Sequence, residues 1–516
     1  MENSRSILKM LDAAAQRGER IAVSDGVLQL TWRQLHTGSH ALAARLCEQT
    51  EPGQPVGVWA ERRAETPLLF FSVLAAGCFY VPLDADMPPA RMAFVCENAQ
   101  LQLVLGCGPR PERLPEGLLW LDCACAAQSP AEPPTTLLRE SAGRQKTAGP
   151  DTPLYLMYTS GSTGMPKGVL KSHGAMQSFV EAFLHEYPIA EEDVLGNQTP
   201  FFFDASAKDL YWWLYTGCRL EILPTRLFSF PTELLKEMDA RCVTVISWAP
   251  SALMMVSQLD AFSEAKPRAL RLVCFVGEVF PTKHLAQWRA ALPDAVFVNL
   301  YGSTEIAGVC CHYRVDRPFE PQETLPIGRA LPGCTVTLRD EDGCCINAPD
   351  QEGELCVEGP TLALGYWRDA ARTARTFAAT DGGRMLHTGD MAVYMPDGTL
   401  AFTSRRDHQI KHMGYRIELG EIEAIASSLP QIDACACIYD TQRSRLILFV
   451  QPPAGQTAEI PALTAALREV LCAYMMPHRI IPLEALPHSA NGKLDRLALA
   501  EQYRQTQRRP RRARPN

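Results

Sequence analysis

Short runs of almost uninterrupted apolar residues limit most strongly how this chain can fold. Val243–Ser247 and Leu272–Val276 are two such runs, and segments with a helical pattern alternate with them along the sequence. A strand that is apolar on both faces must be covered on both faces, as it is in a parallel sheet flanked by helices. The sequence therefore predicts an α/β fold built of layered subdomains.

The length of 516 residues is too great for a single hydrophobic core and predicts several domains. Short strands rich in glycine and turn residues follow one another over 326–404, which favours a β-barrel-like portion. We expect a large N-terminal core at 1–406, a small, mobile α+β domain at 407–500 and a disordered basic tail at 501–516. The region 108–150 is expected to be a surface excursion around one strand, at 118–122.

Charge and cysteine content exclude several classes of function. The formal net charge of -8 argues against binding of nucleic acid. Eighteen cysteines are present, but they form no C-x-x-C pair and no His/Cys spacing typical of zinc sites. The N-terminus lacks the apolar core of a signal peptide, and the longest apolar run, Leu68–Val81, is too short to cross a membrane. We therefore expect a cytoplasmic protein with reduced thiols and no membrane partner.

Arginines are concentrated at the C-terminus and interrupt this acidic balance. They are Arg508, Arg509, Arg511, Arg512 and Arg514. A solvated tail is the simpler interpretation, and an electrostatic dock for an acidic partner is the alternative.

A segment rich in glycine and hydroxyl groups, YTSGSTGMPKG at 158–168, joins two predicted strands. Small residues, hydroxyls and Lys167 suit the binding of a polyphosphate. The segment does not follow the G-x-x-x-x-G-K-[ST] pattern of the common nucleotide loop, because the sixth residue from Gly161 is Pro166. A strand-like run, not a helix, follows Lys167. The sequence predicts a phosphate-binding loop of another geometry.

Further motifs accompany this loop in a characteristic order. They are Thr31–Leu35, Ala75–Asp84, Phe203–Ser206, Asn299–Glu305, Gly353–Leu355, His387–Asp390, the charged stretch 405–423 and Asn491–Arg496. With them, nearly the whole chain resembles an adenylation domain of the adenylate-forming superfamily, which contains nonribosomal-peptide adenylation domains, acyl-CoA synthetases and luciferases. The last two motifs are most similar to the peptide-synthetase branch.

The resemblance implies a reaction in two steps. A carboxylate attacks the α-phosphate of ATP and expels pyrophosphate, and the acyl group then passes to a thiol. ATP and Mg²⁺ are the implied cofactors, with Glu305 as the metal ligand and Thr304 near the α-phosphate. Lys493 is implied to reach the first-step site from the small domain, which would rotate about a hinge at Asp407.

The same resemblance assigns the remaining nucleotide contacts. The phosphates would be held by Thr159, Ser160, Ser162, Thr163 and Lys167, the adenine by Tyr301, and the ribose by Asp390 and Arg405. Three residues depart from the family pattern: Ser303 replaces Pro, Ser404 replaces Gly, and His412 replaces Arg. His412 removes a cation from the loop of the second step, which also bears Lys411 and Gly414.

Asp204 is the residue from which the substrate class is predicted. In the amino-acid branch of the family this aspartate pairs with the α-ammonium of the substrate; here it also stands where it could cap the helix that follows. The implied pocket wall consists of Asp204, Ala205, Lys208, Ser247, Cys274, Val276, Leu300, Gly308 and Val309.

Lys208 follows Asp204 by one helical turn and favours an acidic amino acid as substrate. An ion pair at about 4 Å contributes about 4 kcal/mol at an effective dielectric constant near 20, before desolvation. The alternative is that Lys208 pairs with Asp204 or Asp209 and faces away from the pocket.

The sequence contains neither a carrier-protein signature nor a condensation motif, so we expect a separate phosphopantetheinylated carrier protein to accept the amino acid. Two other functions are possible from the sequence. An acyl- or aryl-CoA synthetase is disfavoured by Asp204. A catalytically inactive scaffold is disfavoured by the presence of Lys167, Glu305, Asp390 and Lys493 together.

Overall fold

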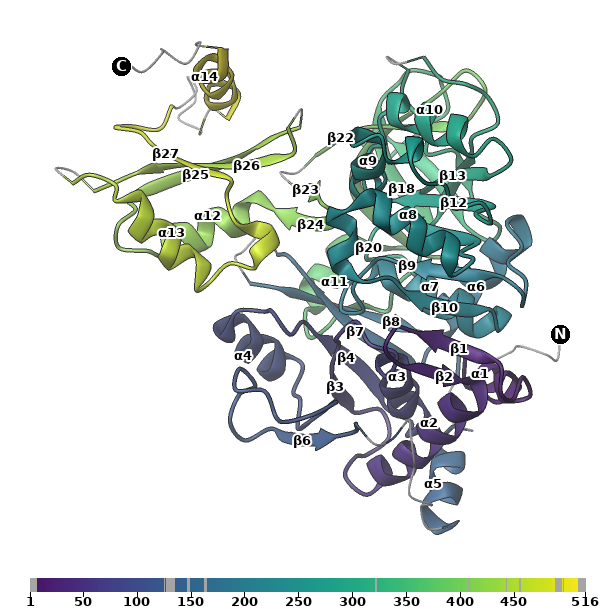
Figure 1. The fold of residues 1–516 in the computed structure, drawn as a ribbon. Coiled ribbons are helices and arrows are strands. Elements are labelled where there is room, and N and C mark those ends of the chain that lie inside the picture. The colour runs from purple at the N-terminus through teal and green to yellow at the C-terminus, as the bar shows by residue number, and fades with distance from the viewer. Residues whose placement is uncertain are drawn as a thin grey trace. The chain divides into compact units, whose positions relative to one another are not determined.

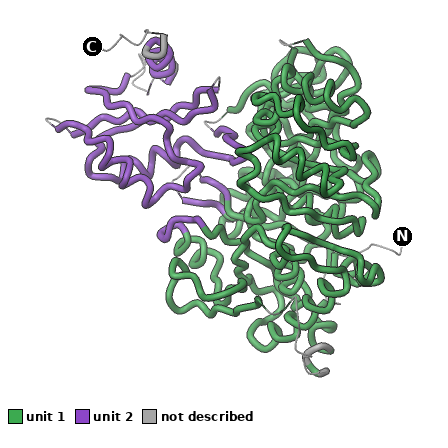
Figure 2. Tube along the Cα trace, viewed as in Figure 1, with its two compact units in different colours: residues 1–85, 92–158, 168–407 green, residues 86–91, 159–167, 408–516 purple. Residues whose placement is uncertain are grey.

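The computed structural model describes residues 7–124, 126, 135–145, 149–161, 165–320, 323–406, 409–441, 443–453, 456–487, 494 and 496–508. The chain forms two compact units (Figure 2). Unit 1 comprises residues 1–85, 92–158 and 168–407, and unit 2 comprises residues 86–91, 159–167 and 408–516.

A nine-stranded sheet in unit 1 has the order β15-β14-β13-β12-β11-β9-β10-β1-β2. Figure 1 labels its strands β1, β2, β9, β10, β12 and β13. Its strands from β13 to β1 pair in parallel. At the two edges the pairs are antiparallel: β1 with β2, β13 with β14, and β14 with β15. The strands are β1 (Ile21–Ser24), β2 (Gln29–Thr31), β9 (Val194–Asn197), β10 (Arg219–Ile222), β11 (Val245–Trp248), β12 (Leu272–Val276), β13 (Val296–Tyr301), β14 (Cys311–Arg314) and β15 (Arg329–Ala330). The two apolar runs of the sequence are thus parallel strands, although β11 begins two residues later than predicted.

Helices alternate with the parallel strands of this sheet, as the pattern predicted. They are α6 (His173–Glu186), α7 (Ala205–Thr216), α8 (Pro231–Ala240), α9 (Pro250–Gln258) and α10 (Thr282–Ala291), with short 3-10 helices η1 (Thr225–Ser229) and η2 (Ala261–Ser263). Helix α6 enters from β8 (Lys167–Ser172) of another sheet, and the later helices connect successive strands of this one. The α/β fold class is confirmed.

A seven-stranded sheet of order β19-β8-β7-β4-β3-β5-β6 lies at the N-terminal side of the sequence. Its strands are β3 (Pro55–Trp59), β4 (Phe79–Leu83), β5 (Leu103–Gly106), β6 (Leu119–Asp122), β7 (Pro153–Thr159), β8 (Lys167–Ser172) and β19 (Gly365–Tyr366). The helices of this region are α1 (Ile7–Ala15), α2 (Trp32–Cys47), α3 (Thr66–Ala75), α4 (Pro89–Asn98) and α5 (Thr135–Gln145). The apolar run 68–81 is therefore a buried helix followed by a strand, not a membrane span.

Helix α5 is a feature that the sequence did not predict. We expected residues 108–150 to contain one strand only, yet α5 is anchored to the core by polar contacts. Ser141 donates to the carbonyl of Ala75 at 2.8 Å, and Arg144 donates to the carbonyl of Thr50 at 2.7 Å. Hydrogen bonds from its side chains to distant carbonyls attach this helix to the core. An apolar periodicity, from which the helix could have been predicted, is therefore not required.

An antiparallel sheet occupies the region of unit 1 where the sequence predicted a β-barrel-like portion. Its order is β17-β16-β18-β21-β20, and β22 pairs with β21. The elements are β16 (Thr335–Arg339), β17 (Cys345–Ile346), β18 (Gly353–Glu358), β20 (Phe377–Thr380), β21 (Gly383–Tyr394), β22 (Leu400–Arg405) and helix α11 (Ala370–Thr376).

Unit 2 is a small α+β unit with its own apolar core. It contains the hairpin β23 (Gln409–His412) and β24 (Tyr415–Glu418), the sheet of β25 (Ala434–Asp440), β26 (Arg445–Gln451) and β27 (Arg479–Pro482), and helices α12 (Leu419–Ser427), α13 (Ile460–Arg468), η3 (Ala473–Met475) and α14 (Arg496–Arg508). Helix α14 extends into the predicted disordered tail, which differs from our expectation. The residues beyond Arg508 lie outside the described ranges.

Two adjacent tryptophans of α7 provide a test of the packing. Trp213 is fully buried, and its indole N–H donates to the carbonyl of Ala22 at 2.8 Å. Ala22 lies where the register between β1 and β2 shifts, so this bond compensates an irregular point of the ladder. Trp212 is equally buried, but its indole N–H has no hydrogen-bond partner among the described residues.

We expect Trp213→Phe to lower the free energy of unfolding by about 1–2 kcal/mol more than Trp212→Phe, because only the former removes a buried hydrogen bond. Urea unfolding of the two variants, which lose similar apolar area, measures the difference. Equal destabilisation would show that the bond to Ala22 contributes nothing.

Candidate functional site

Four of the predicted pocket residues lie on neighbouring parallel strands, three of them near the carboxyl ends of β11, β12 and β13. Ser247 is opposite Cys274 in the pairing of β11 with β12, and Val276 is opposite Leu300 in the pairing of β12 with β13. In open α/β sheets ligands bind beyond the carboxyl ends of the strands. The structure therefore brings these four positions together in the place that the fold makes available to a ligand.

Asp204 precedes α7, but its side chain does not cap the helix. One carboxylate oxygen accepts a hydrogen bond from the hydroxyl of Tyr155 at 2.9 Å, and the other lies 3.8 Å from the ammonium of Lys171. Burial raises the pKa of Asp204, and the charge of Lys171 opposes that shift. The simple capping role that the sequence allowed is therefore not its role in this structure.

Lys171 is a site residue that the sequence analysis missed. It is fully buried on β8, and its ammonium donates to the carbonyl of Ile306 at 2.5 Å. Burial lowers its pKa, while the charges of Asp204 and Glu305 oppose the shift. A lysine inside the apolar run Lys167–Ser172 was the signal that could have revealed it, since buried lysines are rare unless paired.

Lys208 is also buried, and the structure gives it other partners than a ligand. Its ammonium donates to the carbonyls of Ala205 at 2.6 Å and Ser247 at 3.4 Å, and it lies 3.6 Å from a carboxylate oxygen of Asp209. Asp209 in turn accepts a hydrogen bond from Asn197 at 3.0 Å. The alternative that Lys208 pairs with Asp209 is thus the arrangement observed.

The other positions of the predicted pocket wall either are polar or leave little room for a larger side chain. The hydroxyl of Ser247 is buried without a hydrogen-bond partner in the described part of the chain. Gly308 has a φ of +66°, and a Cβ atom there would meet the ring of Phe179 at 2.4 Å. Val309 is buried beside it.

The buried carboxylate of Glu305 comes shortly after the end of β13. One of its oxygens accepts a hydrogen bond from the hydroxyl of Tyr366 at 2.7 Å. Thr304 precedes it in the same turn and is partly exposed. A buried carboxylate oriented by a tyrosine has the chemistry of a ligand for a hard divalent cation.

Asp390, Arg405 and Tyr301 form a second polar cluster in unit 1. Asp390 and Arg405 are opposite each other in the pairing of β21 with β22, and their side chains form a salt bridge. The hydroxyl of Tyr301 donates to the other oxygen of Asp390. The structure thus unites three residues that the sequence separated into an adenine contact and two ribose contacts.

The phosphate-loop residues that the structure describes belong to unit 2. Ser160 donates to the carbonyl of Arg416 at 2.8 Å, and Lys167 lies 3.8 Å from Glu418. The hydroxyl of Thr159 is buried without a hydrogen-bond partner among described residues. Ser162, Thr163, Asp407 and Lys493 lie outside the described residues.

His412, which replaces the arginine of the family pattern, lies in β23 of unit 2. Its ring is 3.2 Å from the hydroxyl of Tyr439, and burial together with His478 lowers its pKa to about 4. The imidazole is therefore neutral at physiological pH, and this position carries no positive charge.

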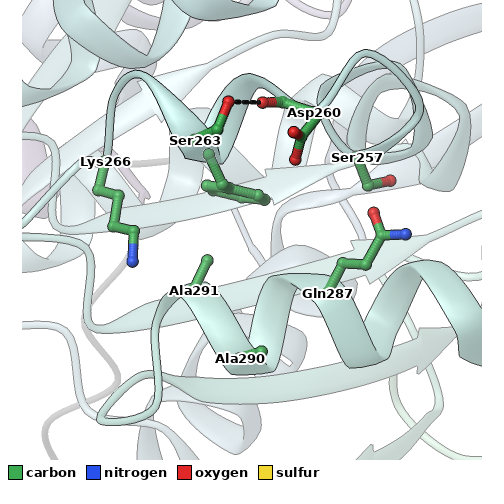
Figure 3. A pocket seen from close by; sticks show the side chains of 8 residues that line it. Ser257, Asp260, Ser263, Lys266, Gln287, Ala290 and Ala291 are labelled. Carbon is green, nitrogen blue, oxygen red and sulfur yellow. Dashed lines mark hydrogen bonds between the residues drawn. The ribbon is translucent and has the colours of Figure 1, made fainter.

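Figure 3 shows a pocket that none of these residues lines. It lies along η2 and α10, and its walls are Ser257, Asp260, Phe262, Ser263, Lys266, Gln287, Ala290 and Ala291. The contact drawn there, from the hydroxyl of Ser263 to the carbonyl of Asp260 at 2.7 Å, is local to the turn. We assign no role to this pocket.

Comparisons with known proteins agree with the motifs. The family model for AMP-binding enzymes matches residues 11–367, and the model for the C-terminal domain of these enzymes matches residues 421–493. No described helix is long and apolar enough to cross a membrane.

Two similar curated proteins are L-proline--[L-prolyl-carrier protein] ligases. The protein from Pseudomonas fluorescens is 31% identical over 96% of this chain and 98% of its own length. The protein from Streptomyces coelicolor is 33% identical over 94% of each chain. A mycosubtilin synthase protein of Bacillus subtilis is 30% identical over 96% of this chain, but the chain spans 19% of that protein's length.

Solved structures show the same architecture. PA1221, described as an NRPS protein containing adenylation and PCP domains, superimposes with a TM-score of 0.81 at 27% identity, covering 96% of this chain and 84% of that one. The adenylation domain AlmE of Vibrio cholerae has a TM-score of 0.83 at 21% identity, covering 98% and 99% of the two chains, and supports the fold alone.

The buried pair of Lys171 and Asp204 predicts a pattern of stabilities. We expect Lys171→Met to lower the free energy of unfolding by about 3–5 kcal/mol, because it leaves a buried carboxylate without its counter-charge. The double variant Lys171→Met/Asp204→Asn removes both charges and should recover most of the loss. Urea unfolding measures both, and a double variant no more stable than Lys171→Met would contradict the pairing.

Proposed function

The chain belongs to the AMP-binding enzyme family and is an amino-acid adenylating ligase, and we propose that it transfers its activated amino acid to the phosphopantetheine thiol of a separate carrier protein. The observation that carries the proposal is the arrangement of Asp204. Its carboxylate contacts Tyr155 and Lys171 instead of capping α7. A carboxylate placed in this way can bind the α-ammonium of an amino acid, which a fatty or aryl acid lacks.

Lys171 is proposed as a positioning residue that acts through Asp204. Burial disfavours the charged form of a carboxylate, and a neutral Asp204 would attract an ammonium only weakly. The ammonium of Lys171 offsets this effect, and its bond to the carbonyl of Ile306 fixes where that charge lies. Tyr155 holds the other carboxylate oxygen, so the acceptor is oriented before the substrate arrives.

The nucleotide roles rest on the two polar clusters of unit 1. Asp390, held by Tyr301 and Arg405, offers carboxylate oxygens suited to ribose hydroxyls. Glu305, oriented by Tyr366, fits Mg²⁺, which would neutralise charge on the phosphates when bound. Thr304 would contact the α-phosphate. Lys493 is proposed as the cation of the first step, Asp407 as the hinge, and the loop residues Thr159, Ser160, Ser162, Thr163 and Lys167 as phosphate contacts.

The carrier protein is proposed from the relatives. Two ligases that match nearly the full chain are named for a prolyl-carrier protein as acceptor, and PA1221 contains an adenylation domain together with a PCP domain. Because His412 is neutral, the neighbouring Lys411 is proposed to supply the cation of the second-step loop.

The side chain of the substrate is a separate question. Two observations favour a substrate with a polar side chain. The hydroxyl of Ser247 has no hydrogen-bond partner among the described residues, and the ammonium of Lys208 lies beside the backbone carbonyl of Ser247. The acidic side chain expected from the sequence stays a proposal, since Asp209 already lies 3.6 Å from Lys208. The names of the two ligases point elsewhere, to L-proline.

The proposed role of Asp204 predicts a selective kinetic defect. In the amino-acid-dependent exchange of pyrophosphate into ATP, Asp204→Asn should raise KM for the amino acid by at least about tenfold, the equivalent of one charge-assisted bond. KM for ATP should change little. Asp260→Asn, at an exposed turn of the same unit, is the control for a general effect of removing a carboxylate.

Thiol acceptors then separate the candidate functions. A phosphopantetheinylated carrier should be loaded with the amino acid, whereas coenzyme A should not. Exchange that requires an acid without an amino group, together with loading of coenzyme A, would support the acyl- or aryl-CoA synthetase instead.

Lys208→Ala tests the substrate side chain. The substrate panel contains glutamate, aspartate, proline, glycine and neutral polar amino acids. If Lys208 binds the substrate side chain, the wild type should favour glutamate or aspartate. The preference of Lys208→Ala for these two substrates should then be lower by about tenfold or more. Unchanged turnover of acidic amino acids in the variant, or a neutral amino acid as the best wild-type substrate, would reject the acidic preference.

A further inference from the structure

Three side chains with metal-binding atoms converge on the surface of unit 1. Asp12 comes from α1, and His36 and His40 come from α2, one helical turn apart on the same face. None of the three belongs to the nucleotide or substrate residues described above. They are partly exposed, with 54% of the Asp12 side chain and 30% and 22% of the two imidazoles accessible.

The distances between the three ligand atoms are compatible with a metal site. The Nε2 atoms of His36 and His40 each lie 3.2 Å from the same oxygen, Oδ1 of Asp12. All three atoms lie within 4.8 Å of one another. A tetrahedral ion with bonds of about 2.0–2.1 Å separates its ligands by about 3.3 Å, so little movement would be needed to admit one.

We propose that Asp12, His36 and His40 bind a divalent transition-metal ion such as Zn²⁺, which ties helix α1 to helix α2. Two imidazoles and a carboxylate are ligands that Zn²⁺ accepts, and water from the exposed side would complete the coordination. The sequence, which contains no His/Cys spacing typical of zinc sites, did not predict this site, because the pairing of two helices brings its ligands together.

A second cluster in unit 1 is less suited to bind a metal ion. Glu354, Cys356 and His387 also approach one another. Glu354, however, already accepts hydrogen bonds from the backbone of Gly389 at 3.0 Å and from Arg406 at 3.4 Å. In the cluster on α1 and α2, by contrast, Asp12 faces the two imidazoles, and one side is open toward solvent.

The ion would complement the apolar attachment of α1. The buried face of this helix, including Ile7, Leu8 and Leu11, packs into the main core of unit 1. Asp12 is on the exposed side and therefore offers a second, polar attachment at the opposite face. A bound ion would restrain the N-terminal helix without occupying the nucleotide or substrate site.

Metal titration of the untagged full-length chain tests the proposal. We expect one equivalent of Zn²⁺ to bind, measured by competition with a chromophoric indicator, and Co²⁺ to give d–d absorption without a thiolate charge-transfer band. His36→Gln and His40→Gln should each weaken binding by at least about tenfold, and Asp12→Asn should weaken it as well. His185→Gln, an exposed histidine of α6, is the matched control and should bind as the wild type does.

Exposed thiols are the competing ligands. Cys242, Cys344 and Cys345 are exposed, so the titration is repeated with all three changed to serine. Retention of one equivalent in that variant supports the proposal. Loss of binding there, or binding by His36→Gln and His40→Gln equal to that of the wild type, would overturn it. Unchanged pyrophosphate exchange and circular dichroism in the histidine variants would show that they are folded.

Discussion

The burial of Asp204 beside Lys171 is the constraint on which the substrate site depends. A carboxylate removed from water must receive partners from the fold, because an isolated buried charge is strongly destabilising. Its partners come from different elements: Tyr155 lies on β7, Lys171 on β8, and Asp204 itself precedes α7. The pair therefore joins the seven-stranded sheet to the helix layer of the nine-stranded sheet, and this junction is also where the substrate ammonium is proposed to bind.

Parallel strand order explains why the other pocket residues meet. Residues on β11, β12 and β13 are far apart in the sequence, but their strands are neighbours and end at the same edge. The apolar character that buries these strands also supplies a largely apolar wall, in Cys274 and Leu300. Polar groups are left at a few positions, such as Ser247 and Lys208, and those positions are the ones able to discriminate between side chains.

The sequence predicted those features that arise from local pattern or from family motifs. The predicted strand Leu272–Val276 has the same bounds as β12, and the apolar run beginning at Leu68, predicted to be too short for a membrane span, divides into a helix and a strand. Helix α5 was missed because side chains such as Arg144 attach it to distant carbonyls. Lys171 was missed because its partner, Asp204, is distant in sequence. For Lys208, the sequence offered the neighbouring Asp209 only as an alternative partner, and this is the pair that the structure contains.

Charge balance gives a further reason to expect a cationic group in this part of unit 1. The carboxylates of Asp209 and Glu305 and the ammonium groups of Lys171 and Lys208 are buried, and the carboxylate of Asp204 is mostly buried, with 12% of its side chain exposed. In their ionised forms, the three carboxylates and two ammonium groups of this set carry a net charge of -1. A substrate ammonium beside Asp204 or a divalent cation beside Glu305 would each compensate it. The same low-dielectric surroundings that make this imbalance costly therefore make the binding of either cation more favourable.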